Sequence, residues 1–332
     1  MRTLSAFRPD CLYLNNTPVR LPGFVPAVTG VTPLDRMLAP YLPRVSPLGQ
    51  LVSYPSFFVY HGQPSPVAPR TWIDGGSWGV LRRAGGWRVR PDKTAVVELT
   101  YPDDHKIVVS PEELLKTQQT SAAVGFTLDI PVPPDCPQQE AHARLRASVE
   151  NARFAVLHCS HPRNFLLYAS LPFVEDTREL FNAIDEVIAF PIDGVALGGM
   201  ALRRRDWNDC LGILAQIRRR IGRLPLHVFG IGDIKRVRQA WEAGADTVDS
   251  SAPLRLALSG RLVGNPKMGM INPSAVERLH LALVNIARFA ALPLAMDLAS
   301  FLISSPIVRL TEPMNTPMDE SCMLPDLEDE TE

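Results

Sequence analysis

The chain has 332 residues, of which 46% are hydrophobic and 21% are charged, and its net charge is −1 at neutral pH. This length provides for one large domain of roughly 250 residues or more, or for two ordinary domains. No apolar stretch reaches the roughly 18 residues of a membrane-spanning helix, and the first residues lack the apolar core of a signal peptide. We therefore expect a soluble, cytoplasmic protein without a membrane partner.

The charge is unevenly distributed. Residues 319–332 hold seven acidic and no basic side chains, so the other 318 residues carry a net charge of +6. We expect residues 306–332 to form an acidic, disordered tail, because this composition buries little apolar surface. Arginines cluster at 82–90, 203–205 and 218–223, which would suit either a polyanion or a solvated helix face.

Residues 1–53 are rich in proline and lack a hydrophobic period, which predicts an irregular segment packed on the following domain. Residues 56–61 and 70–74 then look like strands. Residues 94–110 alternate in polarity around Pro102, as a hairpin does.

Ser110 is expected to cap a helix, with Pro111 at its first position and Glu113 completing a capping box. Strands and helices alternate from there, with strands expected at 125–130, 165–171, 194–201, 225–230 and 246–250, and helices at 138–157, 174–188, 206–221 and 234–243. Two more helices are expected between residues 273 and 301.

Strand–helix units of 25 to 35 residues imply parallel strands joined by crossover helices. An open doubly wound sheet would also fit, but the number of units favours an α/β protein with a (β/α)8 TIM barrel over residues 54–305, including the C-terminal helices. Catalytic side chains of such a barrel lie at the carboxyl ends of its strands.

The nucleotide-binding motif GxGxxG, the P-loop and the GxSxG nucleophile elbow are all missing from the sequence. Five cysteines are spread singly, which suggests neither a disulfide framework nor a cysteine zinc site: Cys11, Cys136, Cys159, Cys210 and Cys322. Carboxylates, however, recur at expected strand ends: Asp74, Asp129, Asp135, Asp193, Asp246 and Asp249. Paired carboxylates serve glycosidic chemistry, although each aspartate could instead have a structural role, above all Asp193 and Asp246.

Several short motifs occur in a characteristic order: Asp74-Gly75-Gly76, SPEELLKTQ (110–118), the segment 129–135, GVALGGMA (194–201), HVFGIG (227–232) and DTVDSSAPLR (246–255). In this order the chain resembles the tRNA-guanine transglycosylases, including relatives that insert 7-deazaguanines into DNA. The likeness spans residues 72–289. It implies exchange of guanine for a 7-deazaguanine in a polynucleotide, either tRNA or DNA.

The resemblance also implies residue roles. Asp249 matches the nucleophile that attacks C1′ of the target ribose, and Asp74 matches the aspartate that handles protons on the bases. The remaining matches concern the substrate: Trp78 and Phe229 on the two faces of the base, Asp135 on its N–H edge, Gly198, Gly199 and Met200 around it, and Arg255 at the nucleic-acid backbone.

Two departures from the family pattern stand out. Ser170 occupies the position of a base-binding glutamine, and its hydroxyl makes fewer hydrogen bonds to a guanine-like edge. The family's zinc motif of three cysteines and a histidine should follow Asp249, yet only Cys322 lies there, so we expect no zinc or other cofactor.

Two alternatives remain open at this stage. The chain could be a noncatalytic partner subunit of a transglycosylase, since such subunits keep the barrel and lose the chemistry; retention of Asp74 and Asp249 speaks against this. It could also be an unrelated barrel enzyme for a small phosphorylated substrate, with residues 230–233 (GIGD) as a weak phosphate loop. A homo-oligomer is compatible with each possibility.

Overall fold

The computed structural model describes residues 8–28, 32–60, 70–76, 85–101, 103–202, 206–263, 265–269 and 272–291. Its centre is a sheet of eight parallel strands. Their order around the sheet is β3 (Gly23–Pro26), β13 (Thr247–Ser250), β12 (Leu226–Val228), β11 (Gly194–Gly198), β10 (Leu166–Pro172), β9 (Val124–Phe126), β5 (Thr71–Asp74) and β4 (Gln50–Ser53).

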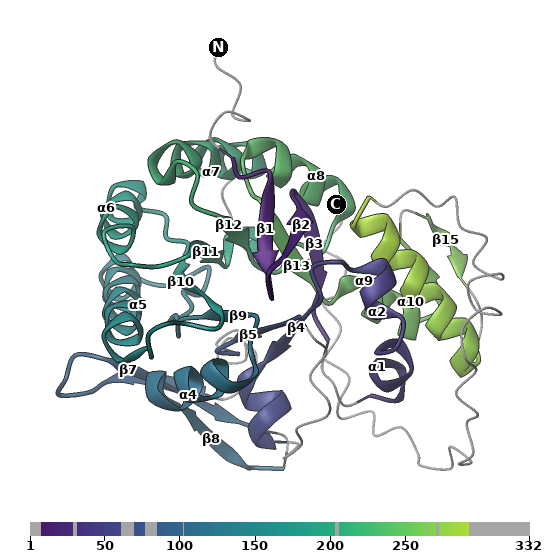
Figure 1. The fold of residues 1–332 in the computed structure, drawn as a ribbon, viewed down its shortest axis with the longest axis horizontal. Helices are drawn as coiled ribbons and strands as arrows, with labels where there is room; N and C mark the ends of the chain where they lie inside the picture. The colour runs from purple at the N-terminus through teal and green to yellow at the C-terminus, as the bar shows by residue number, and fades with distance from the viewer. Residues whose placement is uncertain are drawn as a thin grey trace.

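The first and last strands of this sheet meet, which closes it into a barrel (Figure 1). Ala27, just after β3, forms a parallel bridge with Leu51 of β4, and the backbone N–H of Val28 donates to the carbonyl of Leu51 at 2.9 Å. The expected α/β fold of the (β/α)8 type is thereby confirmed.

Helices alternate with the strands and cover the outside of the barrel (Figure 1). They are α4 (Pro111–Ser121), α5 (Gln138–His158), α6 (Thr177–Val187), α7 (Trp207–Ile221) and α8 (Ile234–Ala243). Ser110 caps α4 as expected, since its side chain accepts from the N–H of Glu113, but the second hydrogen bond of a capping box is not formed between these two residues. Asp206 accepts from the N–H of Asn208 at the start of α7, and Gly222 ends α7 with a φ of 60°. Outward side chains of the strands, such as Leu197 and Val228, join the helices in the largest apolar cluster.

The barrel interior is filled by aromatic rings near its amino end. Trp72, Phe126 and Tyr168 contact one another there, with ring centroids 5.7 to 6.1 Å apart. A hairpin of β1 (Cys11–Leu14) and β2 (Thr17–Arg20) packs its apolar side chains into the same cluster and so plugs this end. The remaining polar space of the barrel therefore lies toward the carboxyl ends of the strands.

Two predictions about the first sixty residues are wrong. The segment 1–53 was expected to be irregular, but it contributes β3 and β4 to the barrel; both strands are buried on two sides, so they show no alternating pattern. Residues 56–61 were expected to be a strand, whereas Pro55–Tyr60 form a π-helix, η2. The barrel thus begins well before residue 54.

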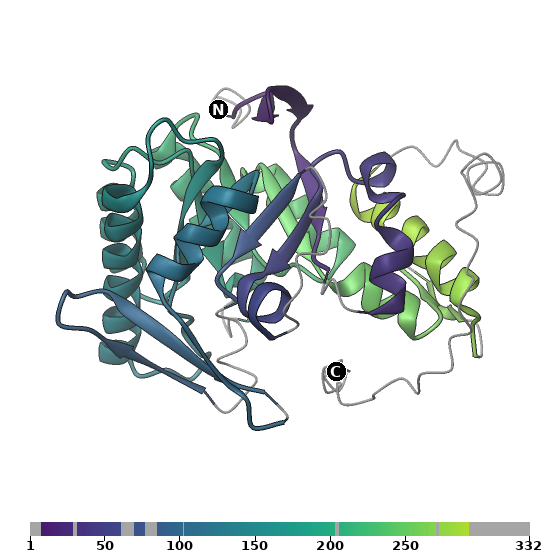
Figure 2. The ribbon, with the colours of Figure 1, turned by 60° about the horizontal axis from the view of Figure 1, so that its bottom comes forward.

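The hairpin expected at 94–110 is confirmed. It consists of β7 (Ala95–Thr100) and β8 (Lys106–Val109), and β6 (Gly85–Val89) adds a third antiparallel strand beside the barrel (Figure 2). On another flank, α1 (Pro33–Leu38) and α2 (Leu42–Val45) pack with α9 (Ala252–Leu258) and α10 (Ala275–Phe289). The second C-terminal helix and the acidic tail lie outside the described residues.

Arginines of the cluster 218–223 have structural roles in this fold. Arg218 is completely buried and forms an ion pair with Asp246, and its guanidinium also donates to the carbonyls of Gly222 and Leu224 at 2.7 and 2.9 Å. Arg220 binds Asp185 at 2.8 Å. These two side chains are therefore engaged within the protein, while residues 203–205 lie outside the described part.

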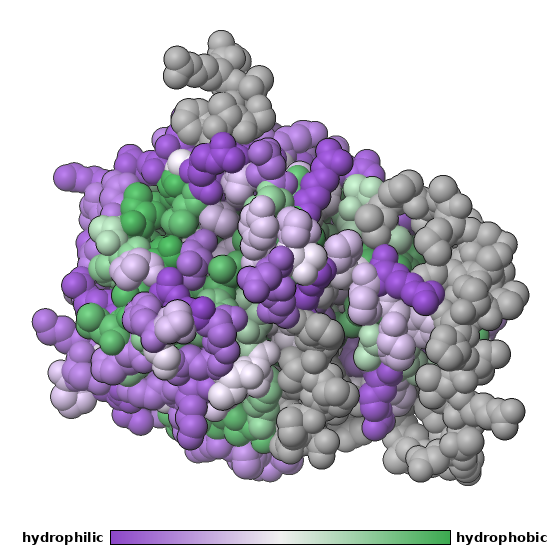
Figure 3. Space-filling model, viewed as in Figure 1, coloured by the Kyte–Doolittle hydropathy of each residue, from purple (hydrophilic) through white to green (hydrophobic). Residues whose placement is uncertain are grey.

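Hydrophilic side chains dominate the surface seen in Figure 3, with hydrophobic surface in separate areas. Large exposed hydrophobic side chains of the described residues are scattered over different elements: Tyr13, Val59, Val89, Val108, Leu157 and Val276. Among the described helices, none is both long and apolar enough to span a bilayer.

Candidate active site

Asp74 and Asp249 lie at the carboxyl ends of two barrel strands. Asp74 is the last residue of β5, and Asp249 lies one residue before the end of β13. Their charges interact strongly enough that Asp249 raises the pKa of Asp74. The two carboxylates, 175 positions apart in sequence, thus share one region of the barrel mouth.

The pKa of Asp74 is raised to about 8, first because the side chain is withdrawn from water and second because Asp249 is negatively charged. Asp129 raises it further. Two hydrogen bonds act in the opposite direction, from Ser53 and from the backbone N–H of Gly76, which lies 3.0 Å from Oδ1. At neutral pH Asp74 is therefore a carboxylic acid that can give up a proton.

Asp249 is held through only one of its oxygens. The backbone N–H of Gly230 donates to Oδ1 at 3.0 Å, and Nε2 of His227 lies 3.2 Å from the same oxygen. Among the described residues, Oδ2 has no hydrogen-bond partner. Since a carboxylate attacks through a free oxygen, Oδ2 is the oxygen available for nucleophilic chemistry.

A third carboxylate, Asp129, lies three residues beyond β9 and is buried. A methyl group on Gly198 at the end of β11 would lie 3.2 Å from Asp129 Oδ2 and 3.9 Å from the ring of Phe229. A hydrogen atom at residue 198 is therefore what leaves room between the carboxylate and the ring. Phe229 itself packs against Phe126, with ring centroids 4.7 Å apart.

Ser170 faces the barrel interior from the middle of β10. Its backbone N–H donates to the hydroxyl of Thr127 at 2.9 Å. The Ser170 side chain is completely buried, and within the described part of the chain its hydroxyl has no hydrogen-bond partner. A buried hydroxyl without a partner is costly, so this position is suited to bind a polar ligand atom.

The structure therefore brings together Asp74, Asp249, Ser170, Gly198 and Phe229 at the carboxyl end of the barrel. It places Asp135 elsewhere: this side chain is exposed, in the turn that leads to α5, whereas Asp129 adjoins Gly198. The sequence pattern contained both aspartates, but it could not show which one the chain turns inward. We take Asp129, rather than Asp135, as the acid of this site.

The structure does not place the other expected residues directly beside the carboxylates. Gly199 follows β11 with a φ of 80°, and Met200 is buried in the outer apolar cluster, so both shape the turn behind Gly198. Arg255 is exposed in the last turn of α9. Trp78 lies outside the described residues.

Asp193 and Asp246 have the structural roles that their sequence context favoured, although neither caps a helix. Both precede strands at the amino end of the barrel. Asp193 accepts from the N–H of Leu167 at 2.8 Å, and Asp246 accepts from the N–H of Leu226 at 2.8 Å while pairing with Arg218. Their carboxylates are thus on the side opposite to the site.

Sequence reasoning missed His227 and Ser53. His227 was one of seven scattered histidines, yet it lies on β12 two residues before Phe229, and alternate residues of a strand share a face. This spacing is a signal that could have placed His227 on the inner face. Ser53 had no such signal, since β4 itself was not expected.

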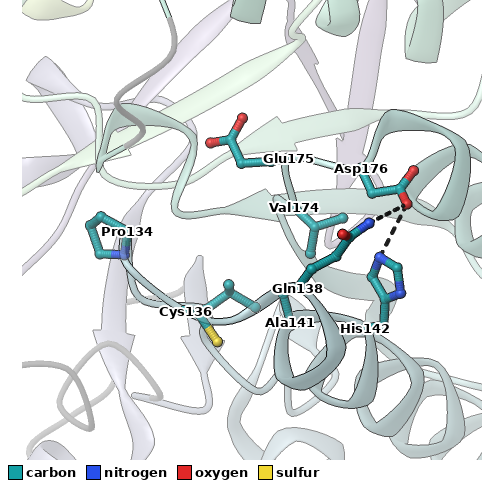
Figure 4. Close-up of a pocket in the computed structure, with 9 residues that line it drawn as sticks. Pro134, Cys136, Gln138, Ala141, His142, Val174, Glu175 and Asp176 are labelled. Carbon is teal, nitrogen blue, oxygen red and sulfur yellow. Dashed lines mark hydrogen bonds and ion pairs between the residues drawn. The ribbon is translucent and has the colours of Figure 1, made fainter.

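A separate cavity of about 300 Å³ opens between the segments that follow β9 and β10. Figure 4 shows Gln138 and His142 both directed at Asp176, at 3.1 and 3.2 Å, while Glu175 points away from them. Asp176 also caps α6. Gln138 and Asp176 therefore stabilise the start of the helix, and we place no chemistry in this cavity.

The family's zinc donors do not fit this chain. Beyond Asp249 the sequence provides one cysteine, Cys322, and one histidine, His280, so two of the four usual ligands are missing. Cys322 lies outside the described residues, and no group of three potential metal ligands occurs within the described ones. The absence of zinc from the protein remains a prediction.

Comparison with known proteins gives a consistent result. The model of the family described as queuine tRNA-ribosyltransferase matches residues 80–282. A queuine tRNA-ribosyltransferase of Protochlamydia amoebophila is 28% identical over 210 residues, which cover 59% of this chain and 50% of that protein. A tRNA-guanine(15) transglycosylase of Methanopyrus kandleri is 28% identical over 159 residues, which cover 47% of this chain and 34% of that protein.

The chain thus spans about half the length, or less, of the curated relatives that it matches. The family match nevertheless covers well over half of this chain and includes Phe229 and Asp249. Together with the closed barrel and the carboxylates at its mouth, this match shows that the chain belongs to the queuine tRNA-ribosyltransferase family.

Proposed function

We propose that the protein is a transglycosylase that exchanges guanine for a 7-deazaguanine base in a polynucleotide through a covalent aspartyl-ribosyl intermediate. The observation that carries this proposal is the unequal pair formed by Asp74 and Asp249. Asp74 holds a proton at neutral pH, whereas Asp249 accepts two N–H groups at one oxygen and leaves the other free. Carboxylates in different protonation states can act as acid and nucleophile.

In the first step, Oδ2 of Asp249 attacks C1′ of the target nucleotide. The C1′–O bond forms as the bond from C1′ to the base nitrogen breaks, and the bonding electron pair leaves with the guanine. The carboxylic acid of Asp74 supplies the proton that neutralises the departing base. An adjacent anion also stabilises the oxocarbenium-like transition state.

In the second step, the incoming base loses its N–H proton to the carboxylate of Asp74 and attacks C1′. The bond between C1′ and Asp249 breaks, which restores the free carboxylate. The two steps return both aspartates to their initial protonation states, so no further co-reactant is needed.

Base recognition follows from the arrangement around Gly198. Asp129 can accept hydrogen bonds from the N–H groups of a guanine-like edge, and Phe229 provides an apolar face for stacking, a contact worth about 1–3 kcal/mol. Trp78 on the second face is carried over from the family resemblance. Ser170 offers its partnerless hydroxyl to the same base. Arg255, exposed on α9, is proposed to contact the phosphate backbone.

The proposed polymer is tRNA. The relatives reported above have names that refer to tRNA, which favours tRNA and a cytoplasmic location. DNA is the alternative, because the chain lacks donors for the family's zinc site. In either case a base within a duplex must first be extruded from its stack.

The experiment offers labelled guanine, in parallel, to bulk tRNA and to duplex DNA. Incorporation into one pool identifies the polymer. Asp249→Ala is expected to abolish incorporation and any covalent adduct, because alanine has no nucleophilic oxygen. Asp209→Ala, which alters an exposed aspartate on α7, is the matched control and should remain active.

Exchange by Asp249→Ala at the parent's rate would show that the mechanism is wrong. No incorporation by the parent protein into either pool would instead support the partner-subunit alternative. Sedimentation with and without nucleic acid would then test whether the chain forms a homo-oligomer or needs a second subunit.

A further inference from the structure

His227 lies at the centre of the barrel, directly beneath the proposed nucleophile. Its side chain is completely buried. The imidazole packs against the rings of Phe126, Phe229 and Trp72, with centroids 4.9, 4.6 and 5.5 Å away. Its only hydrogen-bonding groups are its two ring nitrogens, and each one has a partner: Nδ1 lies 2.9 Å from Thr247 Oγ1, and Nε2 lies 3.2 Å from Asp249 Oδ1.

The two partners determine which nitrogen carries a proton. A carboxylate can only accept a hydrogen bond, so Nε2 must be the protonated nitrogen that faces Asp249. A threonine hydroxyl can donate or accept, so when the proton is on Nε2 alone, the hydroxyl of Thr247 donates to the unprotonated Nδ1. Thr247 and Asp249 are on the same inner face of β13, two residues apart, which aligns both with one ring.

We propose that His227 is a positioning residue for the transglycosylase reaction, which fixes Asp249 through Oδ1 so that Oδ2 points at C1′. This inference rests on the proposed function. Gly230 donates to the same oxygen, so two donors from the segment around β12 hold the carboxylate against rotation. Thr247 acts on Asp249 indirectly, because its hydrogen bond to Nδ1 of His227 keeps the ring proton on Nε2.

His227 neither gains nor loses a proton in this proposal. When Asp249 attacks through Oδ2, Oδ1 becomes the carbonyl oxygen of the ester and still accepts from Nε2–H. When the incoming base displaces the ester, negative charge returns to the carboxylate, and the hydrogen bond from Nε2–H strengthens. His227 therefore assists the breakdown of the covalent intermediate more than its formation.

The test compares His227→Phe with His227→Gln in the guanine-exchange assay. Phenylalanine keeps an aromatic ring but has no donor, so kcat is expected to fall roughly 10- to 100-fold, as for the loss of one hydrogen bond to a charged group, while KM for the polynucleotide changes little. The covalent adduct should accumulate to a higher level than in the parent. Glutamine, whose amide can reach Oδ1, should recover part of the lost kcat.

Tyr168→Phe is the matched control. Tyr168 contributes to the same aromatic layer, and its buried hydroxyl has no hydrogen-bond partner among the described residues, so its removal should leave kcat unchanged. Thr247→Val should also lower kcat, as His227→Phe does, because the imidazole ring then loses the hydroxyl donor that fixes its tautomer. Folding of every variant is checked by circular dichroism.

A second readout does not depend on activity. In protein labelled with ¹⁵N-histidine, the His227 ring, assigned by difference from His227→Gln, should show the proton on Nε2 in the parent and partly on Nδ1 in Thr247→Val. Unchanged kcat in a folded His227→Phe, or an Nδ1–H tautomer in the parent, would overturn the proposal for His227 alone. An inactive parent would overturn the proposed function as well.

Discussion

At the scale of single residues, the site depends on three carboxylates that lie close enough to influence one another: Asp74, Asp129 and Asp249. The pKa of Asp74 is raised as a result, since burial and the charges of Asp249 and Asp129 all favour its protonated form. At neutral pH the raised pKa keeps Asp74 in its protonated form. This property follows from where the Asp74 side chain lies, because all three residues are chemically the same.

The raised pKa of Asp74 has a consequence for stability. Between about pH 4, where aspartate ionises in the unfolded chain, and about pH 8 in the folded protein, unfolding releases a proton from this group. The contribution of Asp74 to the free energy of unfolding is therefore fully present below this window and is lost as the pH rises through it.

Asp74→Asn, which cannot ionise, should consequently gain stability relative to the parent as the pH rises from 5 to 9. Urea titrations at several pH values measure this difference. Asp209→Asn, at an exposed position on α7, is the control. A difference between Asp74→Asn and the parent that stays constant with pH would contradict the raised pKa.

At the scale of elements, the helices and the later strands could be predicted from the sequence, whereas the first two barrel strands could not. The helices α6 to α8 have capping residues and a clear apolar period. The strands β3 and β4 have neither, since each has four residues, buried on both sides and bordered by proline or glycine. Local patterns therefore contain too little information to place them.

The candidate site was predictable to a similar extent. Recognisable motifs mark Asp74, Asp249, Gly198 and Phe229, which lie at or just after the carboxyl ends of strands, and the structure brings them together. The family resemblance pointed to Asp135, which the structure places in an exposed turn, whereas Asp129 is buried. The path of the segment after β9 depends on tertiary packing, so the sequence motif alone did not show which of the two aspartates turns inward.

The ion pair between Arg218 of α7 and Asp246 before β13 connects neighbouring strand–helix units. Both side chains are fully buried, and Arg8 joins them from the N-terminal segment. Arg218→Ala should therefore lower the free energy of unfolding by about 3–5 kcal/mol, because it leaves a buried carboxylate without its main partner. Denaturant titration measures the change, and Arg219→Ala, exposed on the same helix, is the control. An equal, small effect of both variants would contradict this role.

At the scale of the whole molecule, the chain combines the family's barrel with a C-terminal region that lacks the family's zinc donors. Its α9 and α10 instead pack directly against α1 and the barrel through a continuous apolar cluster. Apolar packing thus holds α9 and α10 against α1 and the barrel.

We therefore expect purified protein to contain much less than one zinc ion per chain. Prolonged treatment with a chelator should alter neither its melting temperature nor its exchange activity. Elemental analysis by mass spectrometry and thermal unfolding before and after chelation provide the measurements. One tightly bound zinc ion per chain would show that other residues replace the missing ligands.

The hairpin of β1 and β2, packed into the amino end of the barrel, has a kinetic implication. Leucine and valine side chains of the hairpin close the amino end of the barrel. The departing guanine and the incoming base must therefore both pass through the opening at the carboxyl end. In the proposed reaction guanine therefore leaves before the incoming base enters, and the ribose stays covalently bound to Asp249 between the two steps. If the proposed mechanism is correct, we therefore expect ping-pong kinetics for the exchange.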